Sequence, residues 1–145
     1  MDRDGDGVNN EFDDFPDDPS ASKDTDGDGM PDTITGNSTS DPALVEDLDD
    51  DNDGLTDIEE DVNGNGTFDD GETNSLDPDT DDDGYCDGNV TIVDVCVAVD
   101  AFPLDSSEWL DTDGDGVGNE ADADDDGDGL NDTEEISLGS NPLVK

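Results

Sequence analysis

The chain carries six copies of the pattern Asp-x-Asp-x-Asp-Gly, and a seventh copy has Asn in two of its Asp positions. A random order of the same residues would rarely give even one copy. Alternating side chains with oxygen atoms, followed by a glycine that permits a sharp turn, are what a twelve-residue calcium loop requires. We therefore interpret residues 1–145 as a single array of seven calcium loops, at 2–13, 24–35, 49–60, 61–72, 79–90, 111–122 and 124–135.

Each position of such a loop has its own role. Calcium binds six to eight oxygen atoms, and positions 1, 3 and 5 supply side chains, position 7 its backbone carbonyl, and positions 9 and 12 the remainder. In the first four loops the predicted ligands are Asp2, Asp4, Asp6, Val8, Asn10 and Asp13; Asp24, Asp26, Asp28, Met30 and Asp32; Asp49, Asp51, Asp53, Leu55, Asp57 and Glu60; and Asp61, Asn63, Asn65, Thr67, Asp69 and Glu72. In the last three they are Asp79, Asp81, Asp83, Tyr85 and Asp87; Asp111, Asp113, Asp115, Val117, Asn119 and Asp122; and Asp124, Asp126, Asp128, Leu130, Asp132 and Glu135.

Three of the loops depart from the full ligand set. Thr35, at position 12 of its loop, offers only a hydroxyl, and Val90, at the same position, offers no side-chain oxygen. We expect these two sites to take an oxygen from elsewhere or to hold their ion less tightly. Loop 61–72 has Asn63 and Asn65 in place of Asp, so we expect it to bind at lower negative charge.

Several loops continue their Asp alternation upstream of position 1. Asp47, Asp77 and Asp122 each lie two residues before a loop, and Asp122 is also the twelfth residue of the preceding loop. Because carboxylates placed between two loops can bridge two ions, we expect more than seven calcium ions.

The charge and composition limit what else the chain can do. A formal charge of −45 and 27% hydrophobic residues are typical of a disordered chain, a solvated acidic tail or a halophile surface. Asp outnumbers Glu by 39 to 9 and stands at fixed spacing, which favours metal coordination instead. Three basic residues cannot form a phosphate-binding patch, so we expect no nucleic acid partner. Nor does any apolar run have transmembrane length, so we expect no membrane insertion of this segment.

The predicted fold has little regular secondary structure: an elongated, calcium-stabilised rod of tandem Asp-rich loops with a few short helices. Helices are expected to start at Thr56 and Asn131, and Gly139 is suited to end the second one. Residues 89–99 alternate in a β-like manner and are a candidate β-hairpin. A longer repeat aligns residues 13–29 with residues 100–116.

The repeated pattern, with an apolar residue directly after the glycine, differs from that of an EF-hand. An EF-hand needs a preceding helix and an apolar residue at position 8, which here is mostly polar or small. Asp-x-Asp-x-Asp-Gly-x-x-Asp/Asn-x-x-Asp/Glu instead resembles the thrombospondin type 3 repeat, and residues 54–60 and 129–143 resemble its bacterial and archaeal variants. The resemblance covers most of the chain outside about 36–46 and 89–99. It implies a rod wound around calcium ions, outside the cell or on its surface.

Two further features bear on this location. Cys86 and Cys96, the two cysteines of the chain, flank the β-like run, and we expect a disulfide that closes an insert at 86–96 rather than two buried thiols. Asn37 and Asn89 lie in Asn-x-Thr sequons and are candidate glycosylation sites.

The leading functional hypothesis is a non-enzymatic structural role, as a calcium-stiffened extracellular stalk or fibre subunit. The alternatives are a calcium-dependent adhesion or partner-binding module, and a calcium reservoir or mineral nucleator. Paired carboxylates occur throughout the chain, but the sequence marks no catalytic residue among them. Joining residue 145 to residue 1 would continue the array, so head-to-tail self-association into a filament is also expected.

Overall fold

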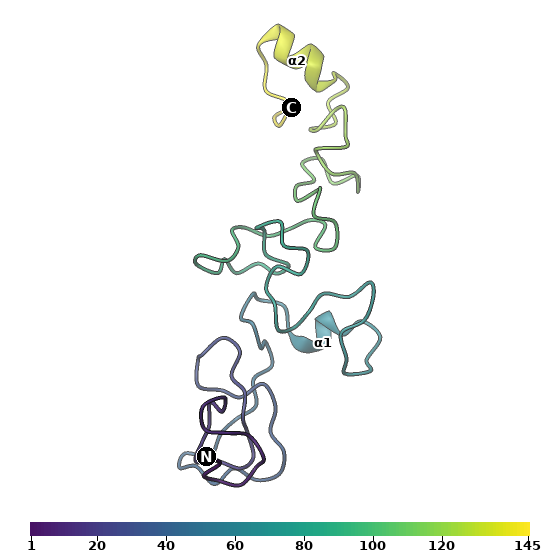
Figure 1. The fold of residues 1–145 in the computed structure, drawn as a ribbon. Coiled ribbons are helices and arrows are strands. Elements are labelled where there is room, and N and C mark those ends of the chain that lie inside the picture. The colour runs from purple at the N-terminus through teal and green to yellow at the C-terminus, as the bar shows by residue number, and fades with distance from the viewer.

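The structure is a computed structural model of residues 1–145, and most of it is irregular. Its regular elements are helix α1, Asp57–Glu60, and helix α2, Asp132–Leu138; the remainder consists of turns, bends and two isolated β-bridges, with no sheet. The chain is elongated, with the N-terminal loops at one end and α2 at the other (Figure 1). This confirms the predicted fold class.

Both helices begin where the sequence predicts, and both place the last residue of a calcium loop. Glu59 accepts hydrogen bonds from the backbone N–H and the hydroxyl of Thr56, which closes a capping box at the start of α1. Asn131 caps α2, and Gly139 ends it with a φ of 81°. The one buried residue of each helix is Glu60 or Glu135, at position 12 of its loop.

The candidate β-hairpin at residues 89–99 is not a pair of strands, and that prediction was wrong. The segment forms only an antiparallel bridge between Ile92 and Cys96 and a parallel bridge between Cys86 and Val99. Asp94 and Ala98 adopt positive φ values of 67° and 59°, which interrupt any extended run. No second layer covers the valines, and Val93 is 82% exposed, so the apolar alternation has nothing to pack against.

The interior of the molecule is made of carboxylates. Ala21, Cys86 and Cys96 are the buried hydrophobic residues, whereas fourteen Asp and Glu residues are buried. Apolar burial on this scale cannot offset the conformational entropy of 145 residues. Carboxylates, which normally stay in water, therefore occupy the place of a hydrophobic core. The groups that bind these carboxylates must supply the stability of the fold.

Loops far apart in the sequence also contact each other directly. Loop 79–90 packs on loop 49–60, where the N–H groups of Gly88 and Val90 donate to the carboxylate and the carbonyl of Asp53. A Cβ atom on Gly88 would lie 2.4 Å from that carbonyl oxygen, so only glycine permits this approach. Asp53 is fully buried as a result.

Candidate metal centres

Most loops gather carboxylates at positions 1, 3 and 5. Six groups of acidic side chains each bring three carboxylate oxygens within 4.8 Å of one another. Five of these groups are Asp2, Asp4 and Asp6; Asp24, Asp26 and Asp28; Asp49, Asp51 and Asp53; Asp79, Asp81 and Asp83; and Asp111, Asp113 and Asp115.

The loop backbone explains how like charges come together. In loop 2–13 the N–H of Gly7 donates to Asp2, that of Asp6 donates to Asp4, and that of Val8 donates to Asp6. The same three bonds recur in loops 24–35, 79–90, 111–122 and 124–135. In each bond a backbone N–H of the loop donates to one carboxylate oxygen of the same loop. The glycine at position 6 makes the reversal possible with a positive φ, for example 103° at Gly7.

Many of the remaining oxygens are buried and accept no hydrogen bond. Fifteen buried side-chain oxygens have no donor; they belong to Asp4, Asn10, Asp13, Asp49, Asp50, Asp51, Glu60, Glu72, Asp81, Asp83, Asp100, Asp125, Asp126 and Glu135, with both oxygens of Glu60 included. An unpaired buried carboxylate is strongly unfavourable unless a cation binds it. Calcium binds carboxylate, amide and carbonyl oxygens, and these are the groups that the loops bring together, so the ligand set fits calcium.

Position 12 supplies an inward-facing carboxylate in four loops. Asp13, Glu60, Glu72 and Glu135 are buried, and each has at least one oxygen without a donor. Asp122 is only half-buried and accepts the N–H groups of Ala123 and Asp124.

Position 9 has a role that the sequence does not reveal. Its side chain accepts a hydrogen bond from the N–H of position 2 in five loops: Asp32 from Thr25, Asp57 from Asp50, Asp87 from Thr80, Asn119 from Thr112 and Asp132 from Asp125. These side chains therefore also hold the start of their own loop.

Loop 61–72 differs from the others because its Asn side chains bring donors into the site. The amide groups of Asn63 and Asn65 donate to Asp69, and these hydrogen bonds lower the pKa of the Asp69 carboxyl. Asn65 still accepts the N–H of Thr67, as an Asp at position 5 does elsewhere. The loop therefore keeps backbone hydrogen bonds of the other loops although it has two fewer carboxylates. That it binds its ion at lower negative charge stays a prediction.

A second kind of cluster lies between neighbouring loops. Burial, and then the nearby charges of Asp57, Asp32 and Asp47, raise the pKa of Asp50 to about 7. Between loops 111–122 and 124–135, burial and the charges of Asp132, Asp122 and Glu120 raise the pKa of Asp125. Asp50 and Asp125 each have a buried oxygen without a donor.

Neither residue is among the ligands predicted from the sequence, because position 2 of a calcium loop normally points away from the ion. A signal was nonetheless present. Among the seven loops, only 49–60 and 124–135 have Asp at position 2, and the same two loops lead into helices.

Not every buried carboxylate belongs to such a site. Burial alone would raise the pKa of Asp18, but hydrogen bonds from Ser38, Ser40 and Ser20 bring it far below its usual value. The carboxylate accepts six hydrogen bonds, which also include the backbone N–H groups of Thr39, Ser40 and Ser20. Asp18 is therefore a structural anchor that ties segment 38–40 to the first loops.

In the absence of calcium, protonation of the buried carboxylates is expected to stabilise part of the fold. Burial, followed by the charges of Asp51 and Asp53, raises the pKa of Glu60 to about 8, and burial raises that of Asp51 to about 7. In an unfolded chain both carboxyl groups have pKa values of about 4. The ion-free fold thus binds more protons than the unfolded chain, so its stability falls as the pH rises from about 4 through 8.

Calcium-stripped protein should therefore be more ordered at pH 4.5 than at pH 8. The stacked rings of Tyr85 and Trp109, whose centroids are 5.4 Å apart, provide a near-ultraviolet circular dichroism signal for this order. Calcium-loaded protein should show the opposite trend, because acid protonates its ligands. A stripped chain with identical spectra at the two pH values would contradict this expectation.

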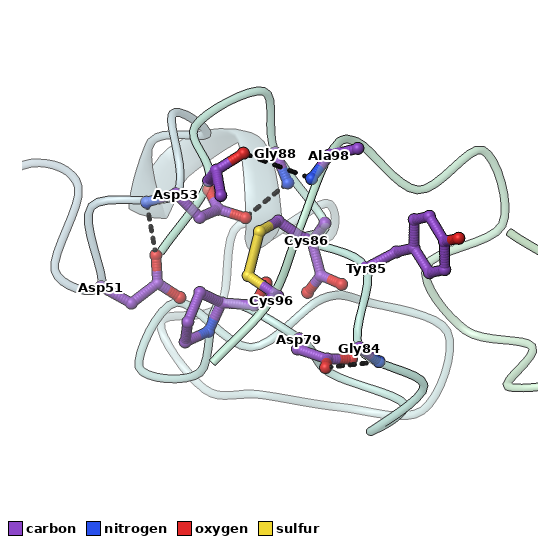
Figure 2. Close-up of a disulfide and its surroundings, with 12 residues drawn as sticks. Asp51, Asp53, Asp79, Gly84, Tyr85, Cys86, Gly88, Cys96 and Ala98 are labelled. Atoms are coloured by element: carbon purple, nitrogen blue, oxygen red, sulfur yellow. Dashed lines mark hydrogen bonds between the residues drawn. A yellow bond between two sulfur atoms is a disulfide. The ribbon is translucent and has the colours of Figure 1, made fainter. Parts of the chain in front are cut away.

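The disulfide predicted between Cys86 and Cys96 is present, with the two Cα atoms 5.1 Å apart. Figure 2 shows the disulfide with the contact of Asp53 and Gly88 on one side and Asp79 and Gly84 on the other. Neither helix has the length and apolar character needed to cross a membrane. The candidate glycosylation residues Asn37 and Asn89 are both exposed.

Comparison with known proteins identifies one segment of the chain. Residues 124–145 match the bacterial TSP3 repeat family. No curated protein and no solved structure matches the chain. The matched segment contains the last Asp-rich loop and helix α2, and the loop has the hydrogen-bond pattern found in the loops before it. Residues 124–145 are therefore similar to the bacterial TSP3 repeat, and the loops before them carry the same Asp-rich pattern.

Proposed function

We propose that the chain is a non-enzymatic structural element, a calcium-stiffened stalk or fibre subunit outside the cell. The observation that carries this proposal is the pairing of fifteen donorless buried oxygens with a core of only three hydrophobic residues. The ligand shells of the ions take the place of a hydrophobic core. Binding free energy for calcium then becomes folding free energy.

The distribution of the sites favours a mechanical role over the alternatives. Acidic clusters occur in loops along the whole length of an elongated chain (Figure 1). Each ion ties together residues close in sequence, and contacts such as Asp53 with Gly88 join loops that are far apart in sequence. A calcium reservoir would need many weak sites but no such contacts between loops.

An extracellular location is supported by the disulfide, since such bonds persist in oxidising compartments. We expect the exposed Asn37 and Asn89 to accept glycan in a host that glycosylates such sequons. Asn65 and Asn131 are in sequons too, but their side chains are engaged with Asp69 and Glu134.

The bound ions should outnumber the seven loops. The clusters around Asp50 and Asp125 each lie between two loops and hold a donorless buried oxygen, so each is expected to bind an additional ion. Native mass spectrometry of the calcium-loaded protein should count more than seven ions.

The double variant Asp50→Asn/Asp125→Asn should lose one ion per junction. Its control, Asp70→Asn/Asp94→Asn, removes the same charge at exposed positions and should lose none. Seven or fewer ions in the parent protein would contradict shared coordination. A reservoir would instead show many weakly held ions without a defined count.

End-to-end association into a filament stays a prediction. Electron microscopy should show threads in calcium that come apart in chelator, and isolated short rods in both conditions would contradict it.

A further inference from the structure

Three of the five loops that have an acidic residue at position 12 share one backbone hydrogen bond. The N–H of position 12 donates to the carbonyl of position 8 in three loops: Glu60 to Thr56 at 3.1 Å, Asp122 to Gly118 at 2.9 Å, and Glu135 to Asn131 at 3.0 Å. This bond turns the chain back over the ion site and carries the position 12 side chain with it.

In loop 79–90 a residue outside the loop forms this bond. Position 8 is Cys86, and its carbonyl accepts the N–H of Asp100 at 2.7 Å. Val90, at position 12, donates its N–H to the carbonyl of Asp53 at 2.6 Å instead. The closing residue therefore comes fourteen positions after Cys86 rather than four.

The side chain of Asp100 is prepared as a ligand. It is 5% exposed, and one oxygen accepts the N–H of Phe102 at 2.7 Å, while the other is buried without a donor. The charges of Asp83, Asp81 and Asp79, the carboxylates at positions 5, 3 and 1 of loop 79–90, act on it. Its free oxygen therefore belongs with their cluster.

The first loop provides an internal reference for this arrangement. Asp13 stands at position 12 of loop 2–13 and aligns with Asp100 in the longer repeat. One of its oxygens accepts the N–H of Phe15 at 2.9 Å, the other is buried without a donor, and the charges of Asp6 and Asp4 act on it. The carboxylates of Asp13 and Asp100 therefore have the same arrangement, with one oxygen on the N–H two residues ahead and the other free.

We propose that Asp100 is the displaced twelfth-position ligand of the calcium site in loop 79–90, and that the disulfide-closed insert holds it there. This inference rests on the calcium binding proposed above. The Cys86–Cys96 bond and the hydrogen bond from Val97 N–H to the Gly84 carbonyl, 2.8 Å long, fold the insert back on its own loop. The segment 87–99 is thus tied back to its loop by a short cross-link. The cross-link reduces the conformational entropy that is lost when Asp100 is brought to the site.

Loop 24–35 is closed by the same backbone bond. The N–H of Asp47 donates to the carbonyl of Pro31, its position 8 residue, at 2.9 Å. Thr35, at position 12, instead donates its hydroxyl to the carbonyl of Ser20 at 3.3 Å. The two loops that lack an acidic position 12 are therefore the two that close through a buried Asp downstream.

A local probe can test the assignment of Asp100. Tyr85 is position 7 of the loop and stacks on Trp109, so a terbium ion bound in loop 79–90 should be sensitised by these rings. Asp100→Asn should weaken terbium and calcium binding at this site by at least about tenfold, since even outer-shell partners of metal ligands contribute about 10–100-fold. Native mass spectrometry should show one ion fewer than in the parent protein.

Two further variants complete the test. Asp94→Asn changes an exposed residue of the same insert by the same charge and should leave both signals unchanged. Asp100→Glu should retain the ion, because two complete loops use Glu at this position. Equal signals from Asp100→Asn and Asp94→Asn, or loss of several ions in Asp100→Asn, would overturn the assignment while leaving calcium binding intact. A parent protein that binds no calcium would instead refute the proposed function.

Discussion

Replacing Glu60 by Gln is expected to weaken calcium binding at loop 49–60 by at least about tenfold and to loosen the middle of the chain. Glu60 is 2% exposed, both of its oxygens lack donors, and the charges of Asp51 and Asp53 act on it. Gln has the same shape but supplies one neutral oxygen and brings an N–H₂ group towards a cation. The substitution thus removes charge from the ligand shell without leaving a cavity.

The effect should spread to loop 79–90, because Asp53 belongs to the same shell and accepts the N–H groups of Gly88 and Val90. Amide hydrogen exchange of these two residues should accelerate in the variant, since local opening becomes easier when their acceptor is less well held. Calcium titration by calorimetry measures the loss of affinity at the site itself.

Glu59→Gln is the matched control. Glu59 is exposed and accepts the N–H and hydroxyl of Thr56, and Gln can keep that capping box. Calcium affinity and exchange rates should stay at the values of the parent protein. The same loss of affinity in both variants would show that overall charge, rather than coordination by Glu60, governs binding.

The features predicted correctly from the sequence are those set within a few residues. Helix starts at Thr56 and Asn131 follow from capping side chains and from the position of the loop glycine. The clustering of positions 1, 3 and 5 follows from alternation around a tight turn. The disulfide between Cys86 and Cys96 likewise depends on a short separation.

The features missed are those that depend on how loops meet. Asp50 is buried and Asp125 is half-buried where carboxylates of a neighbouring segment lie close to position 2. Asp100 reaches loop 79–90 only because the insert before it folds back. Asp100 and the first carboxylates of that loop are too far apart in sequence to fall within one twelve-residue pattern. The alternation in 89–99 looks like a strand, but strands need a partner and this chain provides none.

Loss of calcium is expected to have the largest effect of all, because it removes the partners of every cluster at once. Apart from Asp18, which has its own hydrogen-bond donors, the buried acidic residues would then face one another without counter-charge in a chain of formal charge −45. Three buried hydrophobic residues cannot oppose that repulsion together with the chain entropy. Without the ions the chain should therefore become an expanded coil, apart from the short disulfide-closed segment.

Small-angle X-ray scattering of the parent protein tests this claim most directly, with one sample in millimolar calcium and the other in excess chelator at matched ionic strength and pH. In calcium we expect the scattering of a stiff rod with a defined cross-section. In chelator we expect that of a flexible coil, and the rod should return when calcium is restored. A chelated sample that keeps the rod-like profile would contradict this claim.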